Sequence, residues 1–149
     1  MAKHSSLPML IDLARNGANQ AGKQLQTLAS EKAGADQQLS MLLVYRQDYA
    51  ERLSKAAQTG LSASNYHNFR QFIATLDEAI TQQNRVVAQI DAKIEQGRQH
   101  WHAEKRRVSS FEALQSRDRR QQLTREHRAE QLASDEISAN LYRRARPSH

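Results

Sequence analysis

Residues 59–69, TGLSASNYHNF, form the stretch of this chain where a long helix is most expected to stop. Gly60 suits the left-handed residue that ends a helix. Ser62 suits the N-cap of a following helix, and Leu61 before it can pack against Tyr66 as a hydrophobic staple. The stretch therefore predicts a tight turn between two helical runs.

The composition favours long helices over a thick globular core. The chain has 149 residues, of which 38% are hydrophobic and 5% aromatic, and its mean hydropathy is −0.83. So little apolar material can fill a narrow seam but not a wide core. Ala, Gln, Arg, Leu and Glu are plentiful, and all of them favour helices. The chain has no cysteine, which excludes disulfides and thiolate metal sites.

Upstream of the turn, apolar residues recur at steps of three and four. This is the heptad repeat of a coiled coil, whose apolar residues form a seam along one face of the helix. The alternation holds from Ala18 onward if Lys32 and Arg46 occupy two seam positions. Two successive steps of four, from Leu10 to Ala14 and on to Ala18, predict a stutter that locally unwinds the supercoil.

Downstream of the turn the repeat is stricter. Steps of four and three alternate without a break, and such a repeat requires a facing seam on a partner helix. We expect one helix over about 8–57, roughly 75 Å long, a turn at about 58–62 and a second helix over about 63–140. The seam of the second helix consists of Phe69, Ile73, Leu76, Ile80, Gln83, Val87, Ile90, Ile94, Gly97, Trp101, Glu104, Val108 and Phe111.

So short a turn makes the two helices antiparallel neighbours. Facing residues should then have numbers that add to about 121 or 122, which sets Ala21, a small residue, against Trp101, a large one. Leu7 would lie opposite Gln115, so the chain from about 116 would form an overhang that frays over 141–149. The predicted fold is all-α: residues 1–149 form one domain, a long antiparallel two-helix coiled-coil hairpin with a C-terminal helical overhang.

The charge of the chain favours acidic partners. Its formal net charge is +6 and its pI is about 10.0. Basic clusters gather in the last third, among them Arg117, Arg119 and Arg120. They form either a solvated helix face or a docking surface for an acidic protein or lipid. Nucleic acid is a less favoured partner, because the arginines are spread around the helix and no aromatic platform or known DNA-binding module accompanies them.

No catalytic motif is present. The chain lacks a glycine-rich phosphate loop, a nucleophile elbow and an HExxH pair. The closest histidines, His100 and His102, point to different sides of a helix. We therefore expect no enzyme activity, metal site, cofactor or small-molecule substrate. No apolar stretch is long enough to cross a bilayer, and the amino end lacks a signal-peptide core, which favours the cytoplasm.

Apolar and aromatic residues near the turn exceed what the seam needs. The register aligns four pairs in one stripe on the same side of both helices: Gln38–Gln83, Leu42–Ala79, Tyr45–Leu76 and Tyr49–Phe72. The stripe either thickens the core near the turn or forms a partly exposed patch of the kind that anchors a protein partner.

Four segments carry a resemblance to a known family. LPMLIDLA (7–14), MLLVYRQDYAERL (41–53), TGLSASNYHNF (59–69) and FRQFIATLDEAITQQ (69–83) closely resemble the FliJ family of the bacterial flagellar type III export apparatus. The likeness covers nearly the whole chain and is densest over about 38–83. It implies an antiparallel two-helix coiled coil without enzyme activity, on the cytoplasmic side of the inner membrane at the flagellar base.

The resemblance also implies partners. They are the hexameric ring of the export ATPase FliI, the export gate protein FlhA and the flagellar export chaperones, with FliH as a further candidate. The ATPase ring would receive the overhang with Arg117, Arg119 and Arg120. Two other hypotheses remain, a basic coiled coil that binds nucleic acid and a passive homodimeric scaffold. By resemblance the gate-binding residues are Gln38, Leu42, Tyr45, Tyr49, Phe72, Leu76 and Ala79.

Overall fold

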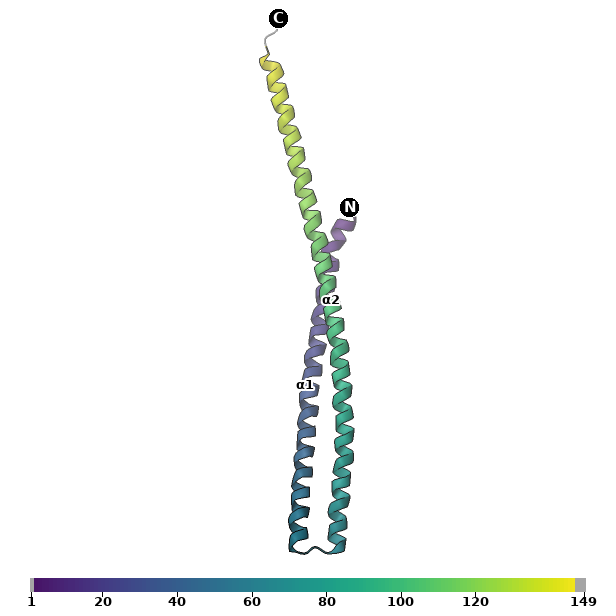
Figure 1. The fold of residues 1–149 in the computed structure, drawn as a ribbon. Helices are drawn as coiled ribbons and strands as arrows, with labels where there is room; N and C mark the ends of the chain where they lie inside the picture. Colours follow the sequence, from purple (N-terminus) through teal and green to yellow (C-terminus); the bar gives the residue numbers. More distant parts are fainter. Residues whose placement is uncertain (1, 147–149) are drawn as a thin grey trace. The chain divides into compact units, whose positions relative to one another are not determined.

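Two helices make up almost all of the computed structural model, which describes the backbone of residues 2–146 and the side chains of residues 6–146. Helix α1 spans Ala2–Thr59 and helix α2 spans Ala63–Ala145. The three residues between them form the connecting loop (Figure 1). These bounds confirm the predicted all-α class and the two-helix arrangement.

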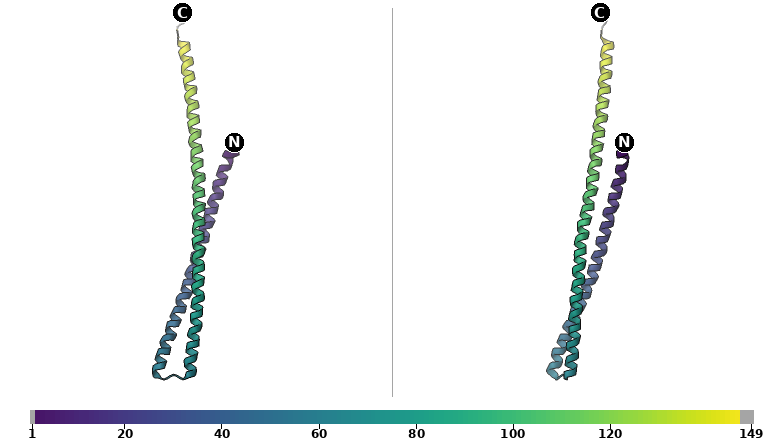
Figure 2. Two further views of the ribbon diagram at one scale, coloured as in Figure 1. Left: turned by 45° about the vertical axis from the view of Figure 1, so that its right-hand side comes forward. Right: turned by 90° about the vertical axis from the view of Figure 1, so that its right-hand side faces the viewer.

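The connecting loop has the predicted chemistry. Gly60 has a φ of 93°, in the left-handed region, where a side chain would be strained. The backbone N–H of Asn65 donates to Ser62 Oγ at 3.2 Å, so Ser62 is the N-cap of α2. The N–H of Tyr66 donates to the Ser62 carbonyl at 2.9 Å. Figure 2 shows this loop from two further directions; the Leu61–Tyr66 staple stays a prediction.

Both helices are longer than their sequence patterns predict. Helix α1 begins at Ala2, not near residue 8, and contains Pro8 in its interior. A proline in a helix interior removes one backbone hydrogen bond and destabilises the helix, yet α1 continues through Pro8. Helix α2 continues to Ala145, past the predicted end at 140, with Arg143 and Arg144 in its last turn. Cations there are favoured by the helix dipole. The fraying expected over 141–149 stays a prediction, and residues 147–149 lie outside the described part.

The chain divides into two compact units. One is Gly17–Glu104, and the other consists of Met1–Asn16 with Lys105–His149, of which the structure describes 2–16 and 105–146. The expectation of one domain over 1–149 therefore stays a prediction, and the two units are described separately below.

In the unit Gly17–Glu104, α1 and α2 pack antiparallel along their seams. A Cβ on Gly97 would lie 3.0 Å from Leu25 Cδ2, and one on Gly22 would lie 3.4 Å from Trp101 Nε1. The numbers of the first pair add to 122 and those of the second to 123, which agrees with the predicted sum of about 121 or 122 to within one residue. The predicted seam positions of this unit are all buried or half-buried, and the most buried among them are Ala18, Ala21, Ala35, Leu76 and Ile90.

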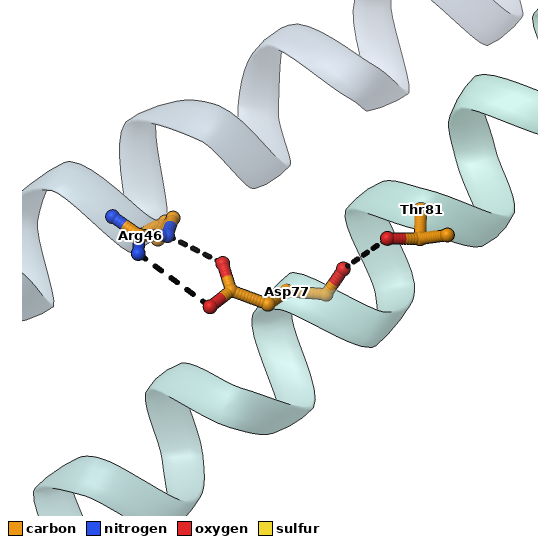
Figure 3. A network of polar contacts seen from close by, with 3 residues as sticks. All are labelled: Arg46, Asp77 and Thr81. Atoms are coloured by element: carbon orange, nitrogen blue, oxygen red, sulfur yellow. Dashed lines mark hydrogen bonds and ion pairs between the residues drawn. The ribbon is translucent and has the colours of Figure 1, made fainter.

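Two seam positions of α1 carry cations. The predicted heptad repeat continues through them only if these two residues take seam positions. Lys32 Nζ lies 2.7 Å from Asp91 Oδ1. The Arg46 guanidinium reaches across to Asp77, and its Nη2 donates to Oδ2 at 3.5 Å (Figure 3). The Asp77 carbonyl accepts from the hydroxyl of Thr81 at 3.0 Å. Each cation therefore occupies a place that an apolar residue would otherwise fill.

These ion pairs shift the pKa of both cations. The hydrogen bond to Asp91, followed by the charge of that carboxylate, raises the pKa of Lys32 above its ordinary value of 10.5. Asp77 raises the pKa of Arg46 in the same two ways. The contribution of the Lys32 pair to stability is thus fully present below pH 10.5 and is lost as the pH rises through the raised pKa.

In the other unit, the seam of α1 passes through Ile11 instead of Leu10. Ile11 is 3% exposed, whereas Leu10 is 37% exposed. With Leu7 half-buried and Ala14 buried, the steps along α1 alternate four and three. The predicted stutter from Leu10 is therefore wrong, because the adjacent isoleucine takes the seam position and keeps the heptad repeat intact.

The seam of α2 in this unit extends beyond its predicted end. Phe111, Gln115 and Asp118 are half-buried, and Arg15 on α1 donates to Glu112 at 3.0 Å. Every described residue from 119 onward is exposed. The overhang thus begins near 119, three residues later than the predicted 116.

Candidate functional site

The aromatic residues near the turn form a cluster that joins the two helices. The ring centroids of Tyr49 on α1 and Phe72 on α2 lie 4.3 Å apart at 36°. Phe69 lies 6.1 Å from Tyr49, and the Arg52 guanidinium carbon lies 5.5 Å from the centre of the Tyr49 ring. Such tilted contacts are favourable geometries for aromatic pairs, so the cluster holds aromatic surface in place across the hairpin.

Six of the seven predicted patch residues present surface to solvent. Tyr45 is 49% exposed and Phe72 is 42% exposed, while Leu42, Tyr49 and Ala79 are half-buried and Gln38 is exposed. We refer to these six residues as the turn-proximal patch. Their role in binding stays a prediction.

Leu76 departs from this pattern. It is 7% exposed and belongs to the core, so it lies beneath the patch surface and is not part of it. Of the two interpretations of the stripe, Leu76 follows the one in which a stripe residue thickens the core, because it also occupies a seam position of α2, where apolar burial is favourable. Its assignment to gate binding stays a prediction.

A glutamine bridges the two helices at the end of the patch remote from the turn. Gln83 Nε2 donates to the Ala35 carbonyl at 3.0 Å and lies 3.3 Å from Gln38 Oε1. The predicted Gln38–Gln83 pair is thereby confirmed. Residue numbering could not show that Gln83 also donates a hydrogen bond to the α1 backbone. This second bond fixes the position of the pair along the helix axis.

Other exposed apolar residues near the turn lie outside the predicted stripe. They were left out of the stripe because the predicted register aligns only the four pairs that define it. Leu43 is 48% exposed and precedes Tyr45 by two residues, which places it about 200° away around α1. This set consists of Met41, Leu43, Val44 and Tyr66.

The predicted arginines of the overhang separate into two groups. Arg117 and Arg120 share a helix face with Arg125 and Arg128, two residues that the sequence analysis had not singled out. Gln121 and Thr124 lie on the same face between them. Arg119 is exposed but lies about 200° from Arg117. The overhang therefore presents one basic face, and Arg119 lies outside it.

Within the described residues, no group of three or more His, Asp or Glu side chains could hold a metal ion. A search of the same residues for helices long and apolar enough to cross a membrane finds none. The features that distinguish this molecule are the turn-proximal patch and the basic face of the overhang. They define an antiparallel coiled-coil protein with candidate binding surfaces.

Comparisons with known proteins identify the family. The family model described as Flagellar FliJ protein matches residues 3–147. Proteins named Flagellar FliJ protein from Escherichia coli K12 and Salmonella typhi are 31% and 30% identical over 138 residues, or 93% of this chain and 94% of each relative. The chain belongs to the FliJ family and is thus a component of the flagellar type III export apparatus.

A solved structure is also similar to this chain. The crystal structure of the type III secretion protein YscO from Vibrio parahaemolyticus is 23% identical, with a TM-score of 0.48. The match covers 91% of this chain and 94% of the YscO chain.

Proposed function

We propose that this chain is a non-catalytic adaptor of the flagellar export apparatus. It binds the export gate FlhA through the turn-proximal patch and the ring of the ATPase FliI through the overhang, and it assists the delivery of chaperones and their substrates. The observation that carries this proposal is the contact of Tyr49 with the exposed Phe72, beside the exposed Tyr45, on a hairpin of this family.

The patch suits a protein partner for a physical reason. Aromatic side chains bury much area at low conformational cost, and they dominate the energetics of many protein interfaces. The contact between Tyr49 and Phe72 fixes the rings before binding, so less entropy is lost when the gate docks.

The overhang suits an acidic partner. Its basic face combines four arginines, which accelerate association with an acidic surface and contribute charge-assisted hydrogen bonds. We assign this face to FliI, keep FliH as a further candidate partner and assign no residue to the chaperones. The proposed location is the cytoplasmic face of the inner membrane at the flagellar base, without membrane insertion.

The patch proposal predicts a large loss of gate affinity in a double variant. Tyr45→Ala/Phe72→Ala should raise the Kd for the purified cytoplasmic domain of FlhA at least about tenfold, because truncating interface hot spots costs about 2 kcal/mol or more. Isothermal titration calorimetry measures the change. Leu43→Ala is the matched control, since Leu43 has similar exposure on another face of α1. Equal loss in the control variant, or wild-type affinity in the double variant, contradicts the assignment.

The basic face predicts a position-dependent effect on the ATPase. Arg117→Glu/Arg120→Glu should weaken binding to purified FliI several-fold more than Arg119→Glu/Arg120→Glu, because only the first pair lies entirely on the basic face. Surface plasmon resonance at two salt concentrations checks this result. If FliI does not bind the wild-type chain, and duplex DNA binds with an affinity that falls steeply with salt, the nucleic-acid hypothesis is favoured instead.

A further inference from the structure

The face of α2 that meets Lys32 and Arg46 carries a charge pattern with the heptad spacing. Every seventh residue on this face forms what we call the charged column, with charges in the order positive, negative, neutral, negative, positive. The α1 residues that face it alternate between leucine and a cation: Leu25, Lys32, Leu39, Arg46 and Leu53. The charged column consists of Arg70, Asp77, Asn84, Asp91 and Arg98.

In the observed register both acids of the column meet cations. Asp91 pairs with Lys32 and Asp77 with Arg46. The outer arginines face leucines: Leu53 and Arg70 line one shallow groove. Arg70 also lies 5.9 Å from the ring centre of Tyr66, and Arg98 pairs with Glu95 on its own helix at 3.3 Å.

An apolar seam alone specifies this register weakly. Because the seam repeats every seven residues, sliding α2 by one heptad brings apolar residues opposite apolar residues again. The loop of residues 60–62 favours the observed register, and polar groups at seam positions add a second feature that distinguishes one register from the next.

The charged column opposes a slide in either direction. Sliding by seven residues one way places Lys32 opposite Arg98 and Arg46 opposite Asn84. The other way places Arg46 opposite Arg70 and Lys32 opposite Asn84. Both slides break both ion pairs and create one contact between two cations.

We propose that the charged column locks the hairpin of residues 17–104 in a single register. The ionic groups of both pairs are roughly half exposed, so each pair alone contributes little to stability. The lock acts through the difference in free energy between the observed and the displaced register. When the helices slide, one contact between like charges replaces two contacts between opposite charges.

The lock has a consequence for the turn-proximal patch, whose residues come from both helices. The contact of Tyr49 with Phe72 and the bond of Gln38 with Gln83 exist only in the observed register. A slide of seven residues would separate both pairs. It would also displace the patch residues of α2 along the hairpin axis from those of α1.

Disulfide trapping tests the lock, since the chain has no cysteine of its own. Ala35→Cys/Val87→Cys reports the observed register, and Ala35→Cys/Ile94→Cys reports the register displaced by one heptad. Each reporter pair is placed in the variant Asp77→Asn/Asp91→Asn/Arg98→Glu, which removes both ion pairs and gives Lys32 an acid in the displaced register. The control carries Arg85→Glu instead of Arg98→Glu, because Arg85 is exposed outside the charged column.

The measured quantity is the ratio of displaced to observed intramolecular cross-link after mild oxidation. We expect this ratio to be about tenfold higher in the Arg98→Glu variant than in the control. Equal ratios, or a displaced cross-link that is undetectable in both, would overturn the proposal. If circular dichroism shows that the triple variant is unfolded, the exchange variant Asp91→Arg/Arg98→Asp, which keeps the net charge, replaces it. Its ratio of displaced to observed cross-link is then compared with that of the chain whose charged column is unchanged, and the same outcomes apply.

Discussion

Leu76→Ala is expected to lower the free energy of unfolding by about 2–4 kcal/mol, the usual cost of deleting a buried leucine side chain. Leu76 is 7% exposed, and α1 and α2 share one narrow seam, so few neighbours can move to fill the cavity. Urea denaturation followed by circular dichroism at 222 nm measures the loss.

The control for this prediction is Leu43→Ala. It removes the same atoms from a residue that is 48% exposed, and it should change the free energy of unfolding by less than about 1 kcal/mol. Equal stability of the two variants would mean that Leu76 is not part of the core, and it would return Leu76 to the exposed patch.

Ala21→Leu is expected to destabilise the hairpin by about 1–3 kcal/mol, because extra methylene groups in a filled core force side chains and backbone apart. Ala21 is 2% exposed, and the predicted register sets it against Trp101, whose indole already lies close to the neighbouring Gly22. Thermal denaturation followed by circular dichroism should show a clear fall in Tm.

Ala33→Leu is the matched control for overpacking. Ala33 is exposed on the same helix, and leucine is nearly as good a helix former as alanine, so the Tm should stay almost unchanged. A higher Tm for Ala21→Leu than for wild type would show that space remains beside Trp101 and would contradict the close packing of α1 against α2.

The fold could be predicted from the sequence because its decisive features are local. Gly60 and Ser62 specify the turn through backbone conformation and capping, and both depend on residues close in the chain. The position of the turn then allows the register to be predicted by numbering, to within about one residue. The choice between Leu10 and Ile11 is different, since either residue continues the apolar pattern and only the facing helix determines which one is buried.

The site could be predicted less completely. The pairs Tyr49–Phe72 and Gln38–Gln83 follow from the register, but Leu76 fits both the seam and the stripe, and spacing alone cannot decide between them. Lys32 and Arg46 were treated as gaps in the seam. Their partners Asp91 and Asp77 lie one or two positions beyond the residues that the numbering sets opposite them, because each pair adds to 123.

The amount of flagellar filament protein secreted into the medium tests the central claim most directly. The claim is that this chain serves export through the turn-proximal patch. Cells that lack the chain should secrete far less filament protein, and expression of the wild-type chain or the Leu43→Ala variant should restore secretion, whereas Tyr45→Ala/Phe72→Ala should not. Normal secretion without the chain, or full restoration by the double variant at equal protein levels, would contradict the account.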